Sequence, residues 1–239
     1  MSSLFKSSIG RKLIMSVSGL FLVLFLLFHG LMNAVVIISP AGYDWIVRML
    51  GANWYALIAT AVLALGFVVH IIYAIVLTLQ NRKARGGDRY AVRGRQANVS
   101  WSSKNMFVLG VVILGFLVLH LAHFWYKMQL VEVMHMLGSN FGDLTKAHQG
   151  VLLIEELFSN PLNSVLYLVW LVAIWFHLTH GFWSAMHTLG WNNQVWFGRM
   201  KTISYALATI ICVLFAAIPV AYLLGFSNEA YLAALNLPF

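Results

Sequence analysis

The sequence predicts an all-α membrane protein that folds as a bundle of five transmembrane helices. Of its 239 residues, 61% are hydrophobic and only 9% are charged, and the mean hydropathy is +0.83. A soluble domain carries about a quarter charged residues. Five long uncharged segments each hold about 20 or more mostly apolar residues, which is the length a helix needs to cross a hydrocarbon core ~30 Å thick. The alternating segments that a β-barrel requires are not found in the sequence.

The five expected spans form a single domain that covers the whole chain. In order, they are residues 13–38, 54–80, 105–126, 162–190 and 202–225 of residues 1–239. Ser39-Pro40 is expected to end the first span, and Pro161 to begin the fourth. We expect Pro219 to kink or end the fifth span, because proline lacks the amide hydrogen that a helix interior uses. The first span is too long for a signal peptide, so we interpret it as a retained anchor.

The distribution of charge predicts the orientation of the bundle. Of the fifteen Lys and Arg residues, only Arg48, Lys127 and Lys146 lie at the expected outer ends, which leaves twelve on the other side. By the positive-inside rule, the N-terminus is cytoplasmic and the C-terminus is outside. This asymmetry explains the net charge of +8 without a nucleic-acid partner. The basic loop 81–104 is expected to bind anionic lipids or to dock a partner protein, and segment 129–160 to hold one or two short interfacial helices.

Four of the five expected spans carry a histidine in the membrane interior. These are His29, His70, His120, and either His177 or His180. A histidine in the hydrocarbon region is costly unless its ring nitrogens have a partner, and a neutral imidazole is a common metal ligand. Inward-facing histidines on four helices are a usual way in which a helix bundle builds a cofactor site.

The depths of these histidines favour two sites over one. Counted at 1.5 Å per residue from the cytoplasmic end of each span, His29 and His120 lie roughly 22–25 Å deep, His70 roughly 15 Å and His177 roughly 20 Å. Two outer and two inner imidazoles predict two b-type haems, each held by two axial histidines. Such iron has no open position, so the expected chemistry is electron transfer. A zinc site would gather its ligands at one point, and a proton relay would include acidic residues within the spans, which hold none.

Several segments together resemble a known family. They are RKLIMSVSGL and LFHGLMN in the first span, LHLAHFW in the third and WFHLTHGFWSAMHTLGW in the fourth, with a lone histidine in the second. In these segments the chain resembles the dihaem cytochrome b subunit of succinate:quinone oxidoreductases, in the single-chain, five-helix type that also serves quinol:fumarate reductases. Each motif is short, but the ordered combination covers essentially the whole chain.

The resemblance implies a three-part enzyme in a bacterial inner membrane. A flavoprotein subunit would carry the succinate and fumarate chemistry, and an iron–sulfur subunit would relay electrons, both on the cytoplasmic side. This multi-pass chain would anchor them among the lipids as the quinone-reactive subunit. Its implied cofactors are two haem b groups, and its implied substrate is a membrane quinone, with menaquinone the expected form.

The resemblance also implies which residues bind the haems. His70 and His177 would hold the haem proximal to the iron–sulfur subunit, and His29 and His120 the distal haem. For the fourth span, depth slightly favours His180. The family pattern favours His177, because the ligand in this family precedes the Gly181 position by four residues. We assign His177.

A serine of the first span is a candidate contact for a haem propionate. Ser16 lies thirteen residues before His29, which places it roughly 20 Å nearer the cytoplasm on the same helix. Within the resemblance, Ser16 would contact a propionate of the proximal haem. A hydrogen bond from Ser16 to its own helix backbone is the equally good alternative.

The outer end of the first span holds candidate quinone-site residues. They are Tyr43, Asp44 and Trp45, because the family's quinone site lies near the distal haem. An interfacial aromatic belt explains the two aromatic residues better. Some dihaem relatives carry a glutamate beside the fourth-span ligand, which is proposed to conduct protons. The three residues before His177 include no acid, so we expect no such proton path.

The sequence is also compatible with two other interpretations of the histidines. One is the dihaem cytochrome b anchor of another respiratory enzyme, such as a hydrogenase or a nitrate reductase. The other is a membrane transport or sensor protein whose histidines are structural. The single cysteine, Cys212, excludes a disulfide framework and a CxxCH haem attachment, and we interpret it as a small packing residue.

Overall fold

The five predicted spans are confirmed in the computed structural model, which describes residues 7–85, 100–191 and 193–237. These residues form helices and no strand. The five helices long and apolar enough to cross a membrane are α1 (Ser8–Ile38), α3 (Trp54–Arg85), α4 (Trp101–His120) with its continuation η1 (Leu121–Trp125), α8 (Pro161–Thr188) and α9 (Gln194–Leu223). Most of the basic loop 81–104, namely residues 86–99, lies outside the described residues.

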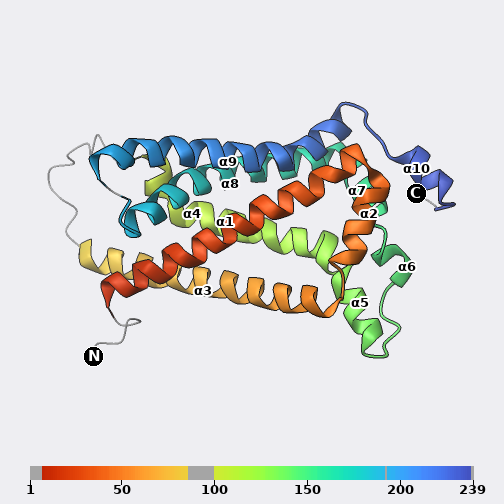
Figure 1. The fold of residues 1–239 in the computed structure, drawn as a ribbon, viewed down its shortest axis with the longest axis horizontal. Coiled ribbons are helices and arrows are strands. Elements are labelled where there is room, and N and C mark those ends of the chain that lie inside the picture. Colours follow the sequence, from red (N-terminus) through yellow and green to blue (C-terminus); the bar gives the residue numbers. More distant parts are fainter. Residues whose placement is uncertain (1–6, 86–99, 192, 238–239) are drawn as a thin grey trace.

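Short helices cover one end of the bundle (Figure 1). They are α2 (Pro40–Met49), α5 (Gln129–Met136), α6 (Leu144–Ala147), α7 (Gly150–Phe158) and α10 (Glu229–Ala234). We call this end the capped end, and the opposite end, where α1 begins, the basal end. Segment 129–160 holds three short helices, whereas one or two were expected. α2 and α10 were not expected.

Four of the five long helices, all but α8, extend further at the basal end than the expected spans. α1 begins at Ser8, α9 begins at Gln194, and α3 continues to Arg85. Lys and Arg residues bound the expected spans, but both are good helix formers, and their long side chains carry the charge toward water. These helices therefore continue beyond the ends of their apolar segments.

Prolines and capping residues set several helix ends as predicted. Ser39 caps α2 with Pro40 at its first turn, and Asn160 caps α8 by accepting the Leu162 N–H at 2.9 Å, with Pro161 next. Proline suits this position because its missing N–H would be unpaired there in any case.

Pro219 does not end the fifth span. α9 continues through Pro219 to Leu223, and the chain turns at Gly225, whose φ of +89° suits glycine. Pro219 lies about one turn before the end of α9. Its missing N–H therefore removes a backbone hydrogen bond only near the end of the helix.

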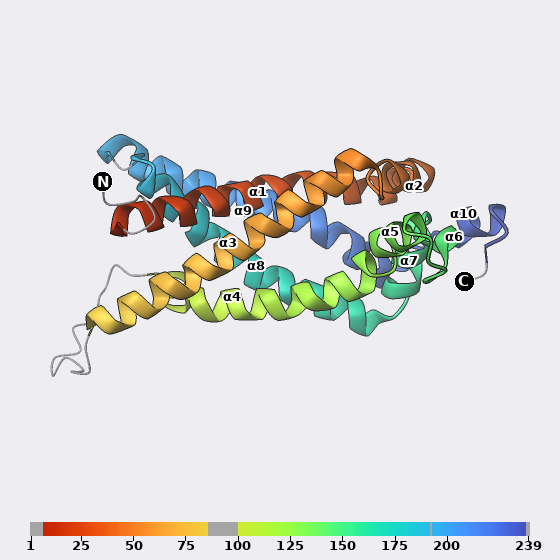
Figure 2. The ribbon, with the colours of Figure 1, turned by 90° about the horizontal axis from the view of Figure 1, so that it is seen from below.

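The two halves of the bundle are packed very differently. α8 lies against α9, α1 and α4, whereas α3 packs on α1 and touches α4 only weakly. Figure 2 shows α3 crossing obliquely between α1 and α4. Of the most apolar window of each helix, 39% of residues are buried within the protein in α8, but none in α3. The protein core thus lies around α8, and α3 lies at the edge of that core.

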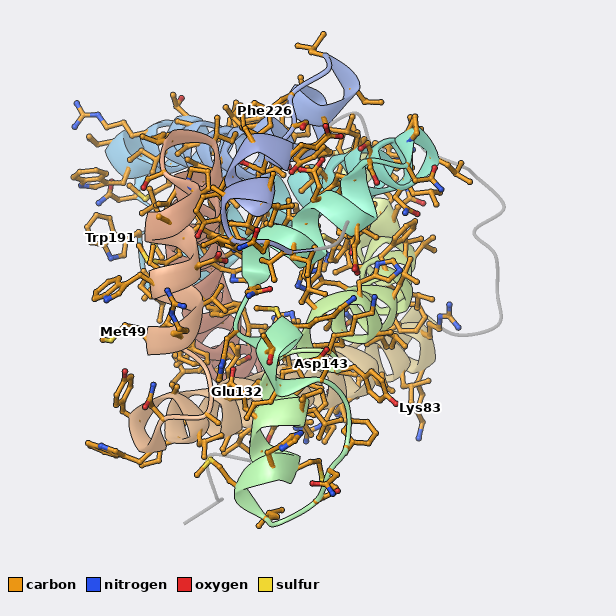
Figure 3. All side chains as sticks on the ribbon, turned by 90° about the vertical axis from the view of Figure 1, so that its right-hand side faces the viewer. Met49, Lys83, Glu132, Asp143, Trp191 and Phe226 are labelled. Carbon is orange, nitrogen blue, oxygen red and sulfur yellow. The ribbon has the colours of Figure 1, made fainter. Side chains whose placement is uncertain are left out.

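Buried carboxylates fasten the capped end, onto which Figure 3 looks. Glu132 of α5 accepts a hydrogen bond from the Ala52 N–H at 2.6 Å, which ties α5 to the turn between α2 and α3. Glu155 of α7 accepts hydrogen bonds from the Tyr222 hydroxyl at 2.7 Å and from the Asn228 N–H at 2.8 Å. These bonds join segments that are far apart in sequence, and they hold the cap on the bundle.

Candidate cofactor site

The four predicted histidines come together as two ring pairs inside the bundle. The rings of His29 and His120 have centroids 5.9 Å apart and planes at 86°. Those of His70 and His177 are 6.3 Å apart, with planes at 62°. A metal bound about 2 Å from a nitrogen of each ring would separate two imidazole centroids by roughly 6 Å. Each pair therefore has the spacing of two axial ligands.

The two pairs lie at different levels of the bundle. Ser18 of α1 is level with His70, since its Oγ lies 3.4 Å from His70 Nδ1. His29 follows Ser18 by eleven residues on the same helix, which is roughly 16 Å along the helix axis. We call His70 and His177 the basal pair, and His29 and His120 the capped pair.

The basal pair has sparse protein surroundings. The Ser18 hydroxyl donates to the Met15 carbonyl oxygen at 3.1 Å, which leaves its oxygen free to accept the Nδ1 hydrogen of His70. That bond would leave Nε2 of His70 as the nitrogen available to a metal. A Cβ at Gly19 would lie 3.3 Å from Cε1 of His70, so glycine makes room for this ring.

The propionate contact of Ser16 stays a prediction, but another serine of α1 lies beside the basal pair. Ser16 is buried, but Ser18 is the serine that reaches a ring of the basal pair. The rotation of the helix could have revealed this. Eleven residues bring Ser18 within roughly 20° of the face that carries His29, whereas thirteen residues turn Ser16 roughly 140° away from it.

The structure also separates His177 from its competitor His180. His177 is the ring that faces His70, while His180 lies beside Trp183 with ring centroids 6.0 Å apart. The assignment of His177 as a ligand stays a prediction, but its ring is the one opposite a partner on another helix.

Aromatic side chains surround the capped pair. Phe25 stacks on His29 with centroids 5.2 Å apart, and Phe215 lies 5.6 Å from the same ring. On the other side, Phe124 and Trp170 lie 5.2 Å and 5.8 Å from the ring of His120. These rings form an apolar wall on both sides of the pair.

Hydrogen bonds through Asn33 connect His29 of the capped pair to Tyr43 of α2. The Asn33 side-chain amide donates to the His29 carbonyl oxygen at 2.8 Å and lies 3.3 Å from His29 Nδ1. The Tyr43 hydroxyl donates to Asn33 Oδ1 at 3.1 Å. Tyr43 is buried, so the prediction that it belongs to an interfacial belt is wrong for this residue. Trp45, at 59% exposed, agrees with the belt.

Asp44 lies in a closed network of hydrogen bonds at the capped end. It is 1% exposed, and it accepts hydrogen bonds from the Val151 N–H at 3.0 Å and from the Tyr231 hydroxyl at 2.9 Å. Burial raises the pKa of Asp44, although these hydrogen bonds and nearby Arg48 oppose the shift. Asp44 connects α2, α7 and α10, which gives it a structural role.

The protein itself leaves part of the histidine site unsatisfied. Within the described residues, the buried Nδ1 atoms of His120 and His177 have no hydrogen-bond partner. A buried polar atom without a partner is costly, which favours a further group in the site. No cluster of three or more His, Cys, Asp or Glu side chains forms among the residues that the structure describes. Paired imidazoles on facing helices fit haem iron, which takes four further ligands from the porphyrin, better than they fit zinc.

Comparisons of the chain with models of protein families, with curated proteins and with solved structures gave no match.

Proposed function

We propose that this chain is the dihaem cytochrome b and membrane-anchor subunit of a succinate:quinone oxidoreductase. One observation carries the proposal: four histidines from four spanning helices meet as two ring pairs, 5.9 Å and 6.3 Å between centroids. Structural histidines would not be expected to meet two by two at ligand spacing and at two levels. The resemblance of the histidine-bearing segments to that family supplies the specific enzyme.

Each part of the bundle has a role in this proposal. The basal pair holds the haem proximal to the iron–sulfur subunit, and the capped pair holds the distal haem. Each bound haem supplies reversible one-electron transfer, with no open iron position for oxygen. Ser18 fixes the orientation of His70, and the aromatic residues around His29 and His120 keep water from the distal site.

The partners follow from the predicted orientation. By the positive-inside rule, the basal end faces the cytoplasm, and there the flavoprotein and iron–sulfur subunits dock. Electrons pass between the iron–sulfur subunit and a membrane quinone, with menaquinone the expected form. Succinate and fumarate react on the flavoprotein, so this chain is the quinone-reactive part of the enzyme. The proposed location is a bacterial cytoplasmic membrane.

A haem assay of the purified chain tests the cofactors. We expect the reduced-minus-oxidised spectrum to show a b-type α-band and the pyridine haemochrome assay to give two haems per chain. A chain that binds no haem when expressed with an ample haem supply would overturn the proposal, and one haem per chain would contradict the paired assignment.

Purification of the native complex tests the enzyme. We expect a subunit with bound flavin and a subunit with iron–sulfur clusters to copurify with the chain, together with succinate-dependent reduction of the haems. A nickel or molybdenum subunit in their place would instead assign the chain to a hydrogenase or a nitrate reductase.

A further inference from the structure

Three polar aromatic residues beside the capped pair are not used by haem ligation. His123 lies on η1, and Tyr167 and Trp170 lie one turn apart on α8. The rings of Tyr167 and Trp170 lie 6.3 Å and 5.8 Å from the ring of His120. We call these three residues, His123, Tyr167 and Trp170, the aromatic triad.

Trp170 offers a hydrogen-bond donor that the protein does not use. Its side chain is 9% exposed, and its buried Nε1 has no acceptor in the part of the chain that the structure describes. A buried indole N–H usually finds a partner, and one without a partner is destabilising. Its own ring stacks on Phe116, with centroids 5.8 Å apart. The unpaired N–H therefore indicates a ligand with an acceptor oxygen beside Trp170.

His123 and Tyr167 form a pair that can present either a donor or an acceptor. The Tyr167 hydroxyl lies 2.9 Å from His123 Nδ1, and the two rings stack at 22°. If the hydroxyl donates to Nδ1, then Nε2 of His123 carries the hydrogen and donates. If Nδ1 carries the hydrogen and donates to the Tyr167 oxygen, then Nε2 accepts. Both states leave the imidazole neutral.

The local helix geometry sets His123 apart from an ordinary helical residue. Directly after His120, the chain changes from α-helix to the wider turn of η1, closed by the Tyr126 N–H to Leu121 carbonyl bond at 2.8 Å. Such π-helical turns often occur at functional sites. His123 is half-buried within a membrane-spanning segment. A polar atom of His123 that is exposed to lipid would be costly without a partner.

We propose that the aromatic triad binds the quinone headgroup, with the Trp170 N–H and Nε2 of His123 as its polar contacts. This inference rests on the proposed function, whose substrate enters from the lipid phase. A quinone offers carbonyl oxygens on a flat ring, which suit two N–H donors among aromatic side chains. Reduction adds two electrons and two protons, so that each carbonyl becomes a hydroxyl. The change of tautomer in the His123–Tyr167 pair allows Nε2 to bind a carbonyl as a donor and a hydroxyl as an acceptor.

Binding of 2,3-dimethyl-1,4-naphthoquinone to the purified haem-loaded chain tests this site by equilibrium dialysis. Trp170→Phe keeps an aromatic ring but removes the N–H together with the five-membered ring of the indole, and we expect about a tenfold higher Kd, the effect of one buried hydrogen bond. His123→Leu is expected to weaken binding at least as much, and His123→Gln, which keeps an N–H near the position of Nε2, to weaken it less.

Trp175→Phe is the matched control, because this indole is on the same helix but donates to Thr209 Oγ1 at 3.0 Å. Its Kd should equal that of the unmodified chain. Unchanged binding in both Trp170→Phe and His123→Leu, with two haems still present, would overturn the quinone site alone. A loss of haem or a shifted haem potential in Trp170→Phe at unchanged Kd would assign the N–H to a haem propionate. A chain that never binds haem would instead contradict the proposed function.

Discussion

The two histidine pairs have nearly the same ring spacing but very different surroundings. The basal pair has one serine contact, Ser18, and a close glycine, Gly19. The capped pair lies among stacked aromatic rings, next to the polar chain through Asn33 and below a layer of short helices. Ligand spacing alone therefore does not distinguish the two sites. Polar groups that could bind a quinone and its protons gather around the capped pair, so the proposed function assigns quinone chemistry to the capped end and electron entry to the basal end.

Removal of a ligand is the most direct test that the two pairs are separate sites. His29→Ala and His120→Ala are expected to lose the same haem, and His70→Ala and His177→Ala the other, because each iron needs both of its imidazoles. The haem content of the purified chain should fall from two to one in each variant.

His180→Ala is the matched control, since His180 lies one turn from His177 and beside Trp183. It should keep both haems. A haem lost in His180→Ala but kept in His177→Ala would show that the ring opposite His70 is not the ligand. Redox titration of the four ligand variants should reveal two groups, each retaining a different midpoint potential.

A larger side chain at Gly19 is expected to disturb the basal pair and leave the capped pair intact. The two methyl groups of Val in Gly19→Val would extend beyond a Cβ that already lies 3.3 Å from His70 Cε1. We expect His70 to be displaced and the haem of the basal pair to be lost or bound weakly, while the other haem remains. The control is Gly115→Val, because within the described residues nothing lies within 4 Å of a Cβ there. Equal haem contents in the two variants would contradict the close fit at Gly19.

The Ser18 hydroxyl is expected to tune the potential of the basal haem. Acceptance of the Nδ1 hydrogen makes His70 a more basic ligand, which stabilises ferric iron and lowers the midpoint potential. Ser18→Ala should raise one of the two potentials by about 40 mV, which corresponds to about 1 kcal/mol for one electron. Ser16→Ala should leave both potentials unchanged. If Ser16→Ala gives the larger shift, the contact seen at Ser18 is not the one that matters.

Ser16 and Ser18 illustrate how much of the candidate site could be predicted from the sequence. Hydropathy predicted five spans because each must bury about twenty apolar residues in lipid. The rise per residue grouped His29 with His120 and His70 with a histidine of the fourth span, but it slightly favoured His180, whereas His177 is the ring that meets His70. The rotation of about 100° per residue separates Ser18 from Ser16, because it brings only Ser18 to the helix face that carries His29.

Other features had no local signal in the sequence. Asp44 meets Val151 and Tyr231, which lie 107 and 187 residues away along the chain. No periodicity predicts such a contact, because it depends on how α2, α7 and α10 pack over the bundle. The unpaired N–H of Trp170 is likewise visible only when the residues around it are known. The sequence thus located the paired histidines, and tertiary packing determined the cap and the aromatic triad.

Asp44 provides the smallest expected effect, and it concerns only the capped end. Burial raises its folded-state pKa above the ordinary value of 3.8. Between that value and the raised one, the folded protein retains a proton that the unfolded chain releases. Stability from this group is therefore present at low pH and falls as the pH rises through the window. Asp44→Asn should remove this dependence, so Tm of the unmodified chain should fall relative to the variant as the pH rises above about 4.

Thermal unfolding of the haem-loaded chain in detergent measures this difference. For a chain of this length, each 1 kcal/mol of difference would correspond to about 2–4 °C in Tm. Asp143→Asn is the control, because Asp143 caps the short α6 at the same end and asparagine caps a helix about as well. Asp143→Asn should keep the pH dependence of the unmodified chain. If Asp44→Asn keeps it too, the dependence arises from another group, and the closed network around Asp44 stabilises the cap equally in both protonation states.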